Sequence, residues 1–412
     1  MKVLIANTSD IEGGAARAAY RLHRALLAED IDSQMLVQSK VSDDYTINGP
    51  VKKIQKGLGK MRPVLDSLPV GRYKDRTKTL FSPLWLPLGG VVDRINAFKP
   101  DVVHLHWVAG GMIRIEDIAR INAPIVWSLH DMWPFTGGCH YDESCGAFRQ
   151  QCGDCKVLQS GQSKDLSRRI YRRKQTVFQK KQDITLVGLS RWLAGEAADS
   201  SLFSAEQVVT LPNPIDTHTF APFDQSAARR LLNLPQDKKL ILFGAMGATS
   251  DPRKGYVQLS QALRRLRAED AELVVFGASQ PKKSAVFSQK AHYLGRLHDD
   301  VALRVLYSAA DVMLVPSLQE NLSNAIMESL SCGTPVVGFN IGGNADMVDH
   351  QQNGYLAKAF DIEDLARGME WVLQHSSPKV LSEAARKKIL DHFEQSLVAN
   401  RYIDLYKKIL SS

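Results

Sequence analysis

The chain has 412 residues, of which 44% are apolar, enough for two domains of about 200 residues that each bury a core. Its formal net charge of +8 resides in the first half, since residues 1–200 carry 29 basic against 21 acidic side chains and residues 201–412 carry 23 of each. No apolar run approaches the ~20 residues of a membrane span, and the chain begins on a short strand instead of a leader. These features argue against a secreted or membrane-spanning protein, so we expect a cytoplasmic one.

The N-terminal residues predict the start of an alternating α/β fold. Residues 3–6 form a short apolar strand, and residues 15–28 place apolar side chains at helical spacing. Between them, Glu12-Gly13-Gly14 gives a glycine turn that lacks the G-x-G-x-x-G spacing of a dinucleotide site. A dinucleotide cofactor is therefore not expected, and the residues alone leave Gly14 as either a binding turn or an ordinary one.

Two segments concentrate the positive charge of the first half. Residues 52–78 hold nine cations against only Asp66 and Asp75, with apolar residues interleaved, and residues 164–181 form a second basic run. Mixed basic and apolar side chains suit an amphipathic segment on an anionic membrane surface, which would make the protein peripheral on the inner face of the cytoplasmic membrane. A solvated insertion fits equally well. Nucleic acid is not expected, because neither run forms a recognisable reading motif.

Histidines lie on or after the next predicted strands, which are residues 102–106, 125–129 and 184–189. His104 and His106 alternate with apolar residues, so they share one face of a strand. His130 and Asp131 come directly after another strand, at the edge where α/β sheets bind ligands. A histidine in such a place either contacts substrate or fixes the following turn.

Four of the five cysteines lie within 17 residues, at Cys139, Cys145, Cys152 and Cys155. Without a secretory leader, disulfides are disfavoured. Four thiolates would suit one structural zinc ion, with His140 as a substitute ligand, although C-x5-C-x6-C-x2-C is not the spacing of a standard zinc ribbon. The alternatives are free thiols packed as small apolar groups and a redox-active pair.

The second half repeats the α/β pattern around a proline-rich turn at residues 212–216. Residues 208–211 lead into this turn, and strands are then predicted at residues 240–243, 273–276 and 311–316, which gives a second doubly wound sheet. The loop at residues 250–255 ends in Arg253-Lys254-Gly255, just before a helix. Two cations at a helix start suit a diphosphate, with a solvated pair as the alternative. Because no pair of carboxylates lies there, we expect catalysis to need no metal cofactor.

Residues 320–343 are the most informative part of the chain. An apolar strand ends before Glu320, a helix follows it, and residues 335–339 form the next strand, so Glu320 lies at the carboxyl end of a strand and Glu328 on a helix. The backbone N–H groups of Asn321, Leu322 and Ser323 are predicted at the helix start, where they would point at an anion such as the diphosphate of a phosphorylated sugar. The alternative is that Glu320 caps the helix and Glu328 is solvated.

Several of these motifs resemble a known family. The spacing of Glu320 and Glu328, the C-G-T-P-V-V run from Cys332 and the Gly342-Gly343 pair resemble the E-x7-E signature of retaining glycosyltransferases of family 4, which have the GT-B fold. Residues 127–155 resemble a W-x-L-H-D…C-H…C…C-x-x-C segment in members linked to surface-polysaccharide assembly, of the colanic-acid type. By this resemblance, Glu320 would bind the donor sugar and Glu328 the nucleotide ribose.

The resemblance also assigns the remaining candidates. Arg253 and Lys254 would neutralise the leaving diphosphate, and Gly14 would approach the diphosphate or the acceptor. His130 would lie beside the donor sugar, with His106 as the second choice.

The implied architecture is two Rossmann-like, doubly wound domains that face a cleft. Residues 1–205, completed by a C-terminal helix within residues 395–412 that crosses back, would bind the acceptor, and residues 206–394 would bind the donor. The expected enzyme transfers a hexose from a nucleoside-diphosphate-sugar to a glycan or lipid-linked oligosaccharide in exopolysaccharide biosynthesis. A catalytically silent relative that binds nucleotide-sugar or glycan stays open as a second class, with an NAD-dependent enzyme more distant.

Overall fold

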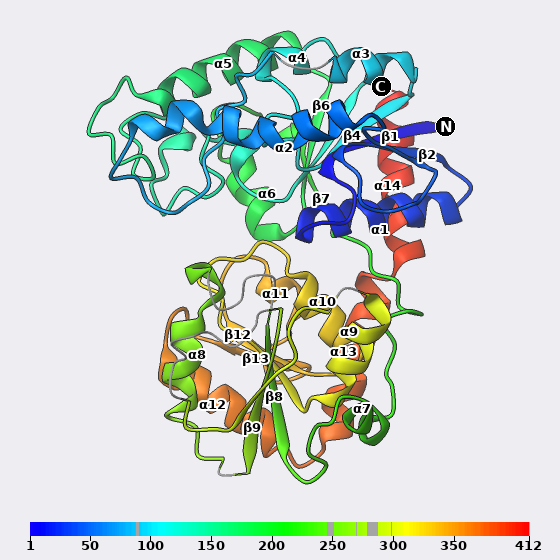
Figure 1. Cartoon of the computed structure of the whole chain (residues 1–412), viewed down its shortest axis with the longest axis vertical. Coiled ribbons are helices and arrows are strands. Elements are labelled where there is room, and N and C mark those ends of the chain that lie inside the picture. Colours follow the sequence, from blue (N-terminus) through cyan, green and yellow to red (C-terminus); the bar gives the residue numbers. More distant parts are fainter. Residues whose placement is uncertain (88–89, 245–250, 269, 278–286, 298, 412) are drawn as a thin grey trace. The chain divides into compact units, whose positions relative to one another are not determined.

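The computed structural model describes residues 1–87, 90–244, 251–268, 270–277, 287–297 and 299–411. Contacts divide the chain into two compact units (Figure 1). Unit 1 comprises Met1–Asn213 together with Val398–Ser412, and unit 2 comprises Pro214–Leu397.

Unit 1 is built on a parallel sheet with the order β3-β2-β1-β4-β5-β6-β7. Its strands are β1 (Lys2–Ser9), β2 (Asp32–Ser39), β3 (Ile47–Asn48), β4 (Val102–Leu105), β5 (Ile125–Leu129), β6 (Ile184–Gly188) and β7 (Val208–Thr210). Its helices are α1 (Gly14–Ala28), α2 (Lys53–Ser67), α3 (Val91–Ala97), α4 (Ile115–Ile118), α5 (Leu166–Lys180) and α6 (Arg191–Ala198), joined by most of α14 (Gln395–Leu410).

The strands of unit 1 are apolar throughout because helices cover both faces of the sheet. Val3 and Ile5 pack with α1 on one face, whereas Leu4 and Ala6 pack into the core of the other face. Helix α14 contributes Tyr402 and other buried residues to the α1 face. The prediction that the C-terminal helix crosses back to the first domain is therefore confirmed.

Unit 2 has a second parallel sheet, with the order β10-β9-β8-β11-β12-β13. The strands are β8 (Lys239–Gly244), β9 (Ala271–Phe276), β10 (Ala291–Tyr293), β11 (Val312–Val315), β12 (Val336–Phe339) and β13 (Gly354–Ala357). The helices are α7 (Gln225–Leu231), α8 (Tyr256–Leu263), α9 (Asp300–Ala309), α10 (Asn324–Ser331), α11 (Asn344–Met347), α12 (Ile362–Leu373) and α13 (Pro378–His392). The prediction of two doubly wound α/β sheets is confirmed. Among the described residues, none of the helices has the length and apolar character required to cross a bilayer.

The second basic run differs from its prediction as a membrane-surface segment. It folds into α5, whose apolar residues Ile170, Val177 and Phe178 are buried in unit 1. Arg173 pairs with Glu116 at 2.6 Å. Periodicity identifies an amphipathic helix but not what its apolar face meets, and in α5 that face meets the protein core.

Candidate active site

The strongest candidate site lies at the carboxyl edge of the sheet of unit 2. Strands β8 and β11 are neighbours there, and the chain runs outward from them in both directions along the sheet. This is the topological switch point, where loops diverge and α/β sheets bind ligands. The loop after β8 leads to Lys254, and the loop after β11 leads to Glu320. Of the loop at residues 250–255, which was predicted to hold the diphosphate, Ser250 lies outside the described residues, as do residues 245–249 before it.

Lys254 and Glu320 form an ion pair across this switch point. The ammonium Nζ lies 3.0 Å from Glu320 Oε2, and the side chains are 26% and 13% exposed. A partly buried pair of this kind keeps more of its attraction than a solvated one. The structure thus brings together the two residues predicted to hold the leaving group and the sugar. It also excludes Lys254 as a freely solvated cation.

Glycine makes the close approach of these loops possible. Gly255 has φ 74°, and a Cβ there would collide with the carbonyl oxygen of Pro316 at the end of β11. The N–H of Leu318 then donates to the carbonyl oxygen of Arg253 at 2.8 Å. The Arg253 guanidinium itself donates to both carboxylate oxygens of Asp251, at 3.2 and 2.8 Å. Each of the two predicted cations is therefore paired with a carboxylate, Arg253 with Asp251 and Lys254 with Glu320.

Helix α10 starts three residues later than predicted. Its N-cap is Ser323, which has an extended backbone with φ −74° and ψ 117°, and its first helical residue is Asn324. Ser323 makes no side-chain hydrogen bond to the first turn, so its extended backbone alone marks the boundary. Asn321, Leu322 and Ser323 therefore precede the helix, and the N–H groups of its first turn belong to residues 324–326.

Glu328 is not the solvated residue of the alternative interpretation. Its side chain is only 4% exposed and accepts a hydrogen bond of 2.8 Å from the Tyr307 hydroxyl on α9. The diglycine turn also joins this region, because the N–H of Gly343 donates to the carbonyl oxygen of Glu320 at 3.4 Å and Gly342 has φ 51°. Loops after β11 and β12 are thereby tied together.

In unit 1, the corresponding carboxyl edge carries glycine and histidines. Gly13 is the residue with the left-handed backbone, φ 100°, and Gly14 is the first residue of α1. His106 Nδ1 and His130 Nε2, which follow the neighbouring strands β4 and β5, lie 2.9 Å apart in a hydrogen bond. The two histidines selected from the sequence thus form a contact pair.

The histidines of this edge are neutral at physiological pH. Burial lowers the pKa of His130 to about 4 and that of His104 to about 3, and it lowers the pKa of His106 well below the usual range. His104 is held between the Tyr406 hydroxyl and Ser128 Oγ, at 2.6 and 2.8 Å. The buried Nε2 of His106 finds no hydrogen-bond partner among the described residues. A neutral imidazole there can exchange hydrogen bonds with a hydroxyl but carries no charge.

A buried polar network behind His130 escaped the sequence analysis. Asp131 Oδ2 accepts hydrogen bonds from Trp107 Nε1 at 2.9 Å and His140 Nδ1 at 2.6 Å, and His140 Nε2 lies 2.8 Å from Ser82 Oγ. These contacts fix the loop after β5. The contact between His140 and Asp131 could not be predicted from the sequence, because it depends on how the loop between them folds.

A buried lysine anchors the same loop. Lys174 of α5 donates to the carbonyl oxygens of Trp133 and Thr136, and its Nζ lies 3.4 Å from the centre of the Trp133 ring. Burial lowers its pKa to about 7. In the sequence, Lys174 looked like one more surface cation of the basic run.

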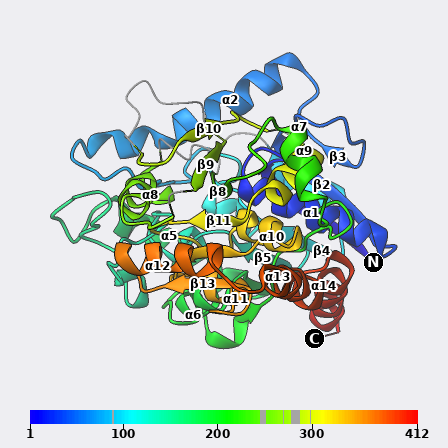
Figure 2. The same cartoon turned by 90° about the horizontal axis from the view of Figure 1, so that it is seen from below.

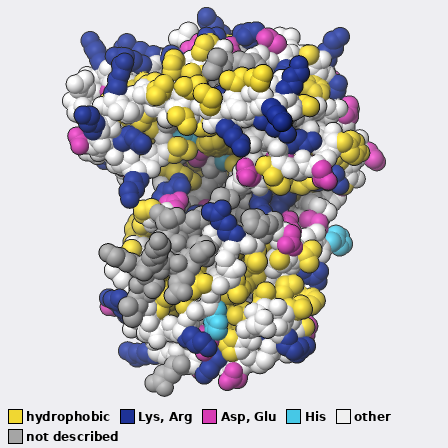
Figure 3. All heavy atoms as spheres, in the orientation of Figure 1, with side chains coloured by type: hydrophobic (Ala, Val, Ile, Leu, Met, Phe, Trp, Pro, Cys, Tyr) yellow, Lys and Arg dark blue, Asp and Glu magenta, His cyan; other side chains and the backbone are white. Residues whose placement is uncertain are grey.

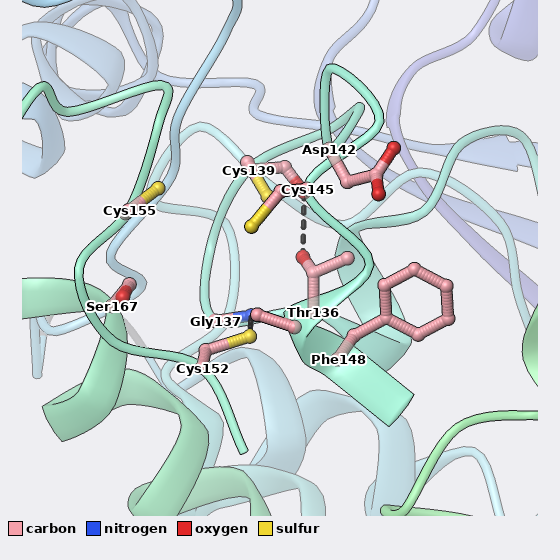
Figure 4. Close-up of a pocket in the computed structure, with 10 residues that line it drawn as sticks. Thr136, Gly137, Cys139, Asp142, Cys145, Phe148, Cys152, Cys155 and Ser167 are labelled. Atoms are coloured by element: carbon pink, nitrogen blue, oxygen red, sulfur yellow. Dashed lines mark hydrogen bonds between the residues drawn. The ribbon is translucent and has the colours of Figure 1, made fainter. Parts of the chain in front are cut away.

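The four cysteines line one hollow in unit 1, together with residues such as Thr136 and Ser167 (Figure 4). A hydrogen bond between the thiols of Cys139 and Cys155 raises the pKa of Cys139 and lowers that of Cys155. Cys152 Sγ accepts from the Gly137 N–H at 3.1 Å. Within the described ranges, no group of three or more His, Cys, Asp or Glu side chains is arranged to hold a metal ion. His140 is wrong as a substitute ligand, since both of its ring nitrogens are engaged by Asp131 and Ser82.

Comparison with known proteins places this arrangement in a family. The model described as "Glycosyltransferase Family 4" matches residues 12–219, and that described as "Glycosyl transferases group 1" matches residues 237–375. The D-inositol 3-phosphate glycosyltransferase of Xylanimonas cellulosilytica is 28% identical over 370 residues, which are 85% of this chain and 80% of that protein.

Solved structures show the same fold. Sucrose-phosphate synthase from Thermosynechococcus elongatus aligns over 100% of both chains, with a TM-score of 0.69 and 16% identity. Anabaena HepE in complex with UDP-glucose aligns over 99% of this chain and 100% of its own, with a TM-score of 0.67 and 16% identity. These likenesses confirm the predicted GT-B architecture of two Rossmann-like units. Because the first family model spans half of the chain, the protein belongs to glycosyltransferase family 4 and is a glycosyltransferase.

Proposed function

We propose that this glycosyltransferase takes a hexose from a nucleoside-diphosphate-sugar and transfers it, with retention, to a hydroxyl of a glycan or lipid-linked acceptor in cytoplasmic polysaccharide assembly. The observation that carries the proposal is the Lys254–Glu320 pair at the switch point of unit 2, with its 3.0 Å separation. A cation beside a ligand-binding sheet edge suits the diphosphate. A carboxylate in contact with that cation suits the hydroxyls of the attached sugar.

The proposed chemistry needs charge where the leaving group departs. The bond between the anomeric carbon and the diphosphate oxygen breaks, and the acceptor oxygen bonds to the same face of that carbon. The acceptor proton passes to the departing phosphate oxygen, so no separate enzymic base is required. Lys254 stabilises the negative charge that grows on the diphosphate, assisted by Arg253.

Glu320 has two tasks in this proposal. Its carboxylate holds Lys254 in place through the ion pair, and its other acceptor positions bind sugar hydroxyls. Glu328 would bind the nucleotide ribose, an assignment that its placement on α10, hydrogen-bonded to Tyr307, supports. Residues 321–323 and the first turn of α10 would donate N–H groups to the phosphates.

His130 would bind the uncharged sugar of the donor. We assign His130 to order the donor sugar, because an imidazole whose pKa is about 4 exchanges hydrogen bonds without competing with Lys254 for the diphosphate. Gly14, at the first position of α1, would let the backbone approach a bound phosphate or acceptor. We propose that the transfer needs no divalent ion, since Lys254 and Arg253 supply the positive charge.

A nucleotide-sugar panel tests this proposal. A true donor should raise the melting temperature, because a ligand that binds only the native state stabilises it, and incubation should release free sugar or a product with the anomeric configuration of the donor. Activity should persist in EDTA. Inversion, or a strict need for magnesium, would contradict the proposed mechanism. Stabilisation by a donor without any turnover would identify the chain as a catalytically silent binding relative.

A further inference from the structure

Helix α2 of unit 1 turns its apolar residues away from the protein. Within α2 and the short helix that follows it, Ile54 is 77% exposed, Met61 54%, Val64 65% and Leu68 58%. At 100° per residue, these positions fall on one side of the helix. Surface helices ordinarily bury that side, as α5 does with Ile170.

The opposite side of α2, which faces unit 1, is polar or lacks a side chain. Gln38 Nε2 donates to the carbonyl oxygen of Gly59 at 3.3 Å, and Arg62 lies 3.4 Å from Gln38 Oε1. Asp66, only 2% exposed, accepts from the Trp85 N–H at 3.3 Å. Gly59, Arg62 and Asp66 follow helical spacing, so the helix is anchored through them and its apolar side stays unused.

A row of lysines borders the apolar side. Lys53, Lys56 and Lys60 are all exposed and lie on the helix between its apolar side and its anchored side. Between residues 45 and 74, the only acidic residue is the buried Asp66. The exposed surface of α2 therefore combines apolar and positively charged side chains without a negative one. Figures 1 and 2 show α2 along the outside of unit 1, and Figure 3 shows hydrophobic and basic side chains gathered on that face.

The chemistry of this surface points to one occupant. We propose that α2 docks unit 1 onto an anionic lipid bilayer, with Ile54, Met61, Val64 and Leu68 inserted at the boundary of headgroups and acyl chains. The lysines reach the lipid phosphates beside them. Trp85, 39% exposed and hydrogen-bonded through its indole N–H to the carbonyl of Asp66 at 3.1 Å, adds an aromatic ring suited to the same boundary.

Charge argues against the other occupants. A second copy of the chain would set two lysine rows against each other, which costs energy without exposed carboxylates to offset it. Nucleic acid would use the lysines but leave the four apolar side chains exposed. An anionic bilayer is the partner that satisfies both kinds of side chain in one plane. The docking rests on the proposed function only in that a lipid-linked acceptor would lie in the same bilayer. The docking itself involves neither donor nor acceptor.

Vesicle flotation of the full chain tests the docking. Vesicles of phosphatidylcholine alone are compared with vesicles that contain one quarter phosphatidylglycerol, at low and high sodium chloride. We expect binding only to the anionic vesicles and a fall in binding as salt rises. The triple change of Lys53, Lys56 and Lys60 to Gln should lower the partition coefficient by up to about a hundredfold. The double change Ile54→Ser and Val64→Ser should lower it by at least about tenfold.

Matched controls lie on other helices. Lys379, Lys387 and Lys407 are exposed, so their change to Gln removes the same charge, and Val301→Ser with Val380→Ser removes the same kind of exposed apolar side chain. Both control variants should bind like the unchanged chain. Circular dichroism and the melting temperature of each variant verify the fold.

Other results overturn the docking. Absence of binding, equal binding to neutral vesicles, or equal losses in the control variants would each do so. Dimerisation that is lost in the Ile54→Ser, Val64→Ser variant would assign the surface to a second copy instead. Because flotation is performed without substrates, and donor-induced stabilisation is measured without vesicles, failure of the docking and failure of the proposed function give different results.

Discussion

The carboxyl edges of the two sheets are built from opposite chemistry. In unit 2, the edge is charged, with Lys254 and Glu320 in an ion pair at 3.0 Å. In unit 1, it is lined by the buried imidazoles of His104 and His106 and the partly buried one of His130, and desolvation lowers the pKa of His130 to about 4. One parallel α/β plan thus carries an ion pair at one edge and neutral imidazoles, beside the Asp131 carboxylate, at the other.

The difference follows from how each edge is enclosed. The loops of unit 2 leave Lys254 26% exposed and pair it with the Glu320 carboxylate. The loop after β5 in unit 1 is covered by the network of Asp131, His140 and Ser82, and desolvation there disfavours the charged form of histidine. Under the proposed function, a cation is kept at the edge assigned to the diphosphate, and the imidazoles are neutral at the edge assigned to the sugar hydroxyls.

The largest expected effect comes from the charged edge. Lys254→Ala should lower the turnover number by about a hundredfold to a thousandfold, because it removes the cation that stabilises charge developing in the transition state. Steady-state kinetics with the donor found in the panel would measure this effect. Lys379→Ala, at an exposed position of α13, should leave turnover unchanged. Equal kinetics for Lys254→Ala and the unchanged enzyme would remove Lys254 from the mechanism.

The two carboxylates should differ from each other. Glu320→Gln should lower turnover by about tenfold to a hundredfold, since a hydrogen bond to a charged group is lost, whereas Glu328→Ala should mainly raise KM for the donor. Tyr307→Phe removes the hydroxyl that donates to Glu328 but keeps the Glu328 carboxylate. Comparison of this variant with Glu328→Ala distinguishes the loss of the carboxylate's position from the loss of the carboxylate itself. The assignments are wrong if both glutamate variants keep normal kinetics.

The neutral imidazole of His130 should make the free energy of unfolding depend on pH. Because the folded-state pKa of His130 is about 4, below the unfolded value of about 6.5, the unfolded chain binds a proton first as the pH falls. The free energy of unfolding should therefore decrease from pH 6.5 towards pH 4, and His130 contributes at most about 1.4 kcal/mol per pH unit.

Urea unfolding at several pH values would measure this slope. His130→Gln should make the slope shallower. An identical slope in His130→Gln would mean that His130 is not held neutral by the fold.

The smallest expected effect on activity concerns the cysteine hollow. A structural zinc ion stays a prediction, and it requires about one zinc per purified chain and its release by Cys152→Ser. Removal of the metal should destabilise the loop after β5. The transferase activity that the protein retains should not depend on added divalent ions. Elemental analysis without zinc, together with free thiols in the native protein, would assign the hollow to packed cysteines.

Sequence patterns located the charged edge well. Apolar runs predicted β8, β11 and β12, and parallel strands bring their carboxyl ends to one edge, where the structure places Lys254 and Glu320. Their ion pair was not predicted. The start of α10 was misplaced because both Glu320 and Ser323 could precede a helix, and only the backbone angles distinguish them.

The neutral edge was less predictable for a physical reason. Asp131, His140 and Ser82 meet through loop geometry, and Lys174 is buried although its sequence neighbours are basic. The orientation of α2 was also hidden, since a helical pattern does not tell which side touches the protein. Long-range burial, which no local pattern records, decided each of these cases.

Under the proposed function, Lys254 of unit 2 binds the diphosphate of a sugar donor. Isothermal titration calorimetry with UDP, GDP, ADP and CDP tests it most directly, because the nucleoside diphosphate is the leaving group itself. We predict that at least one of them binds, and that Lys254→Ala weakens this binding by about tenfold to a hundredfold while Lys379→Ala does not. Absence of binding to all four, or equal affinity for Lys254→Ala and the unchanged protein, would contradict the account.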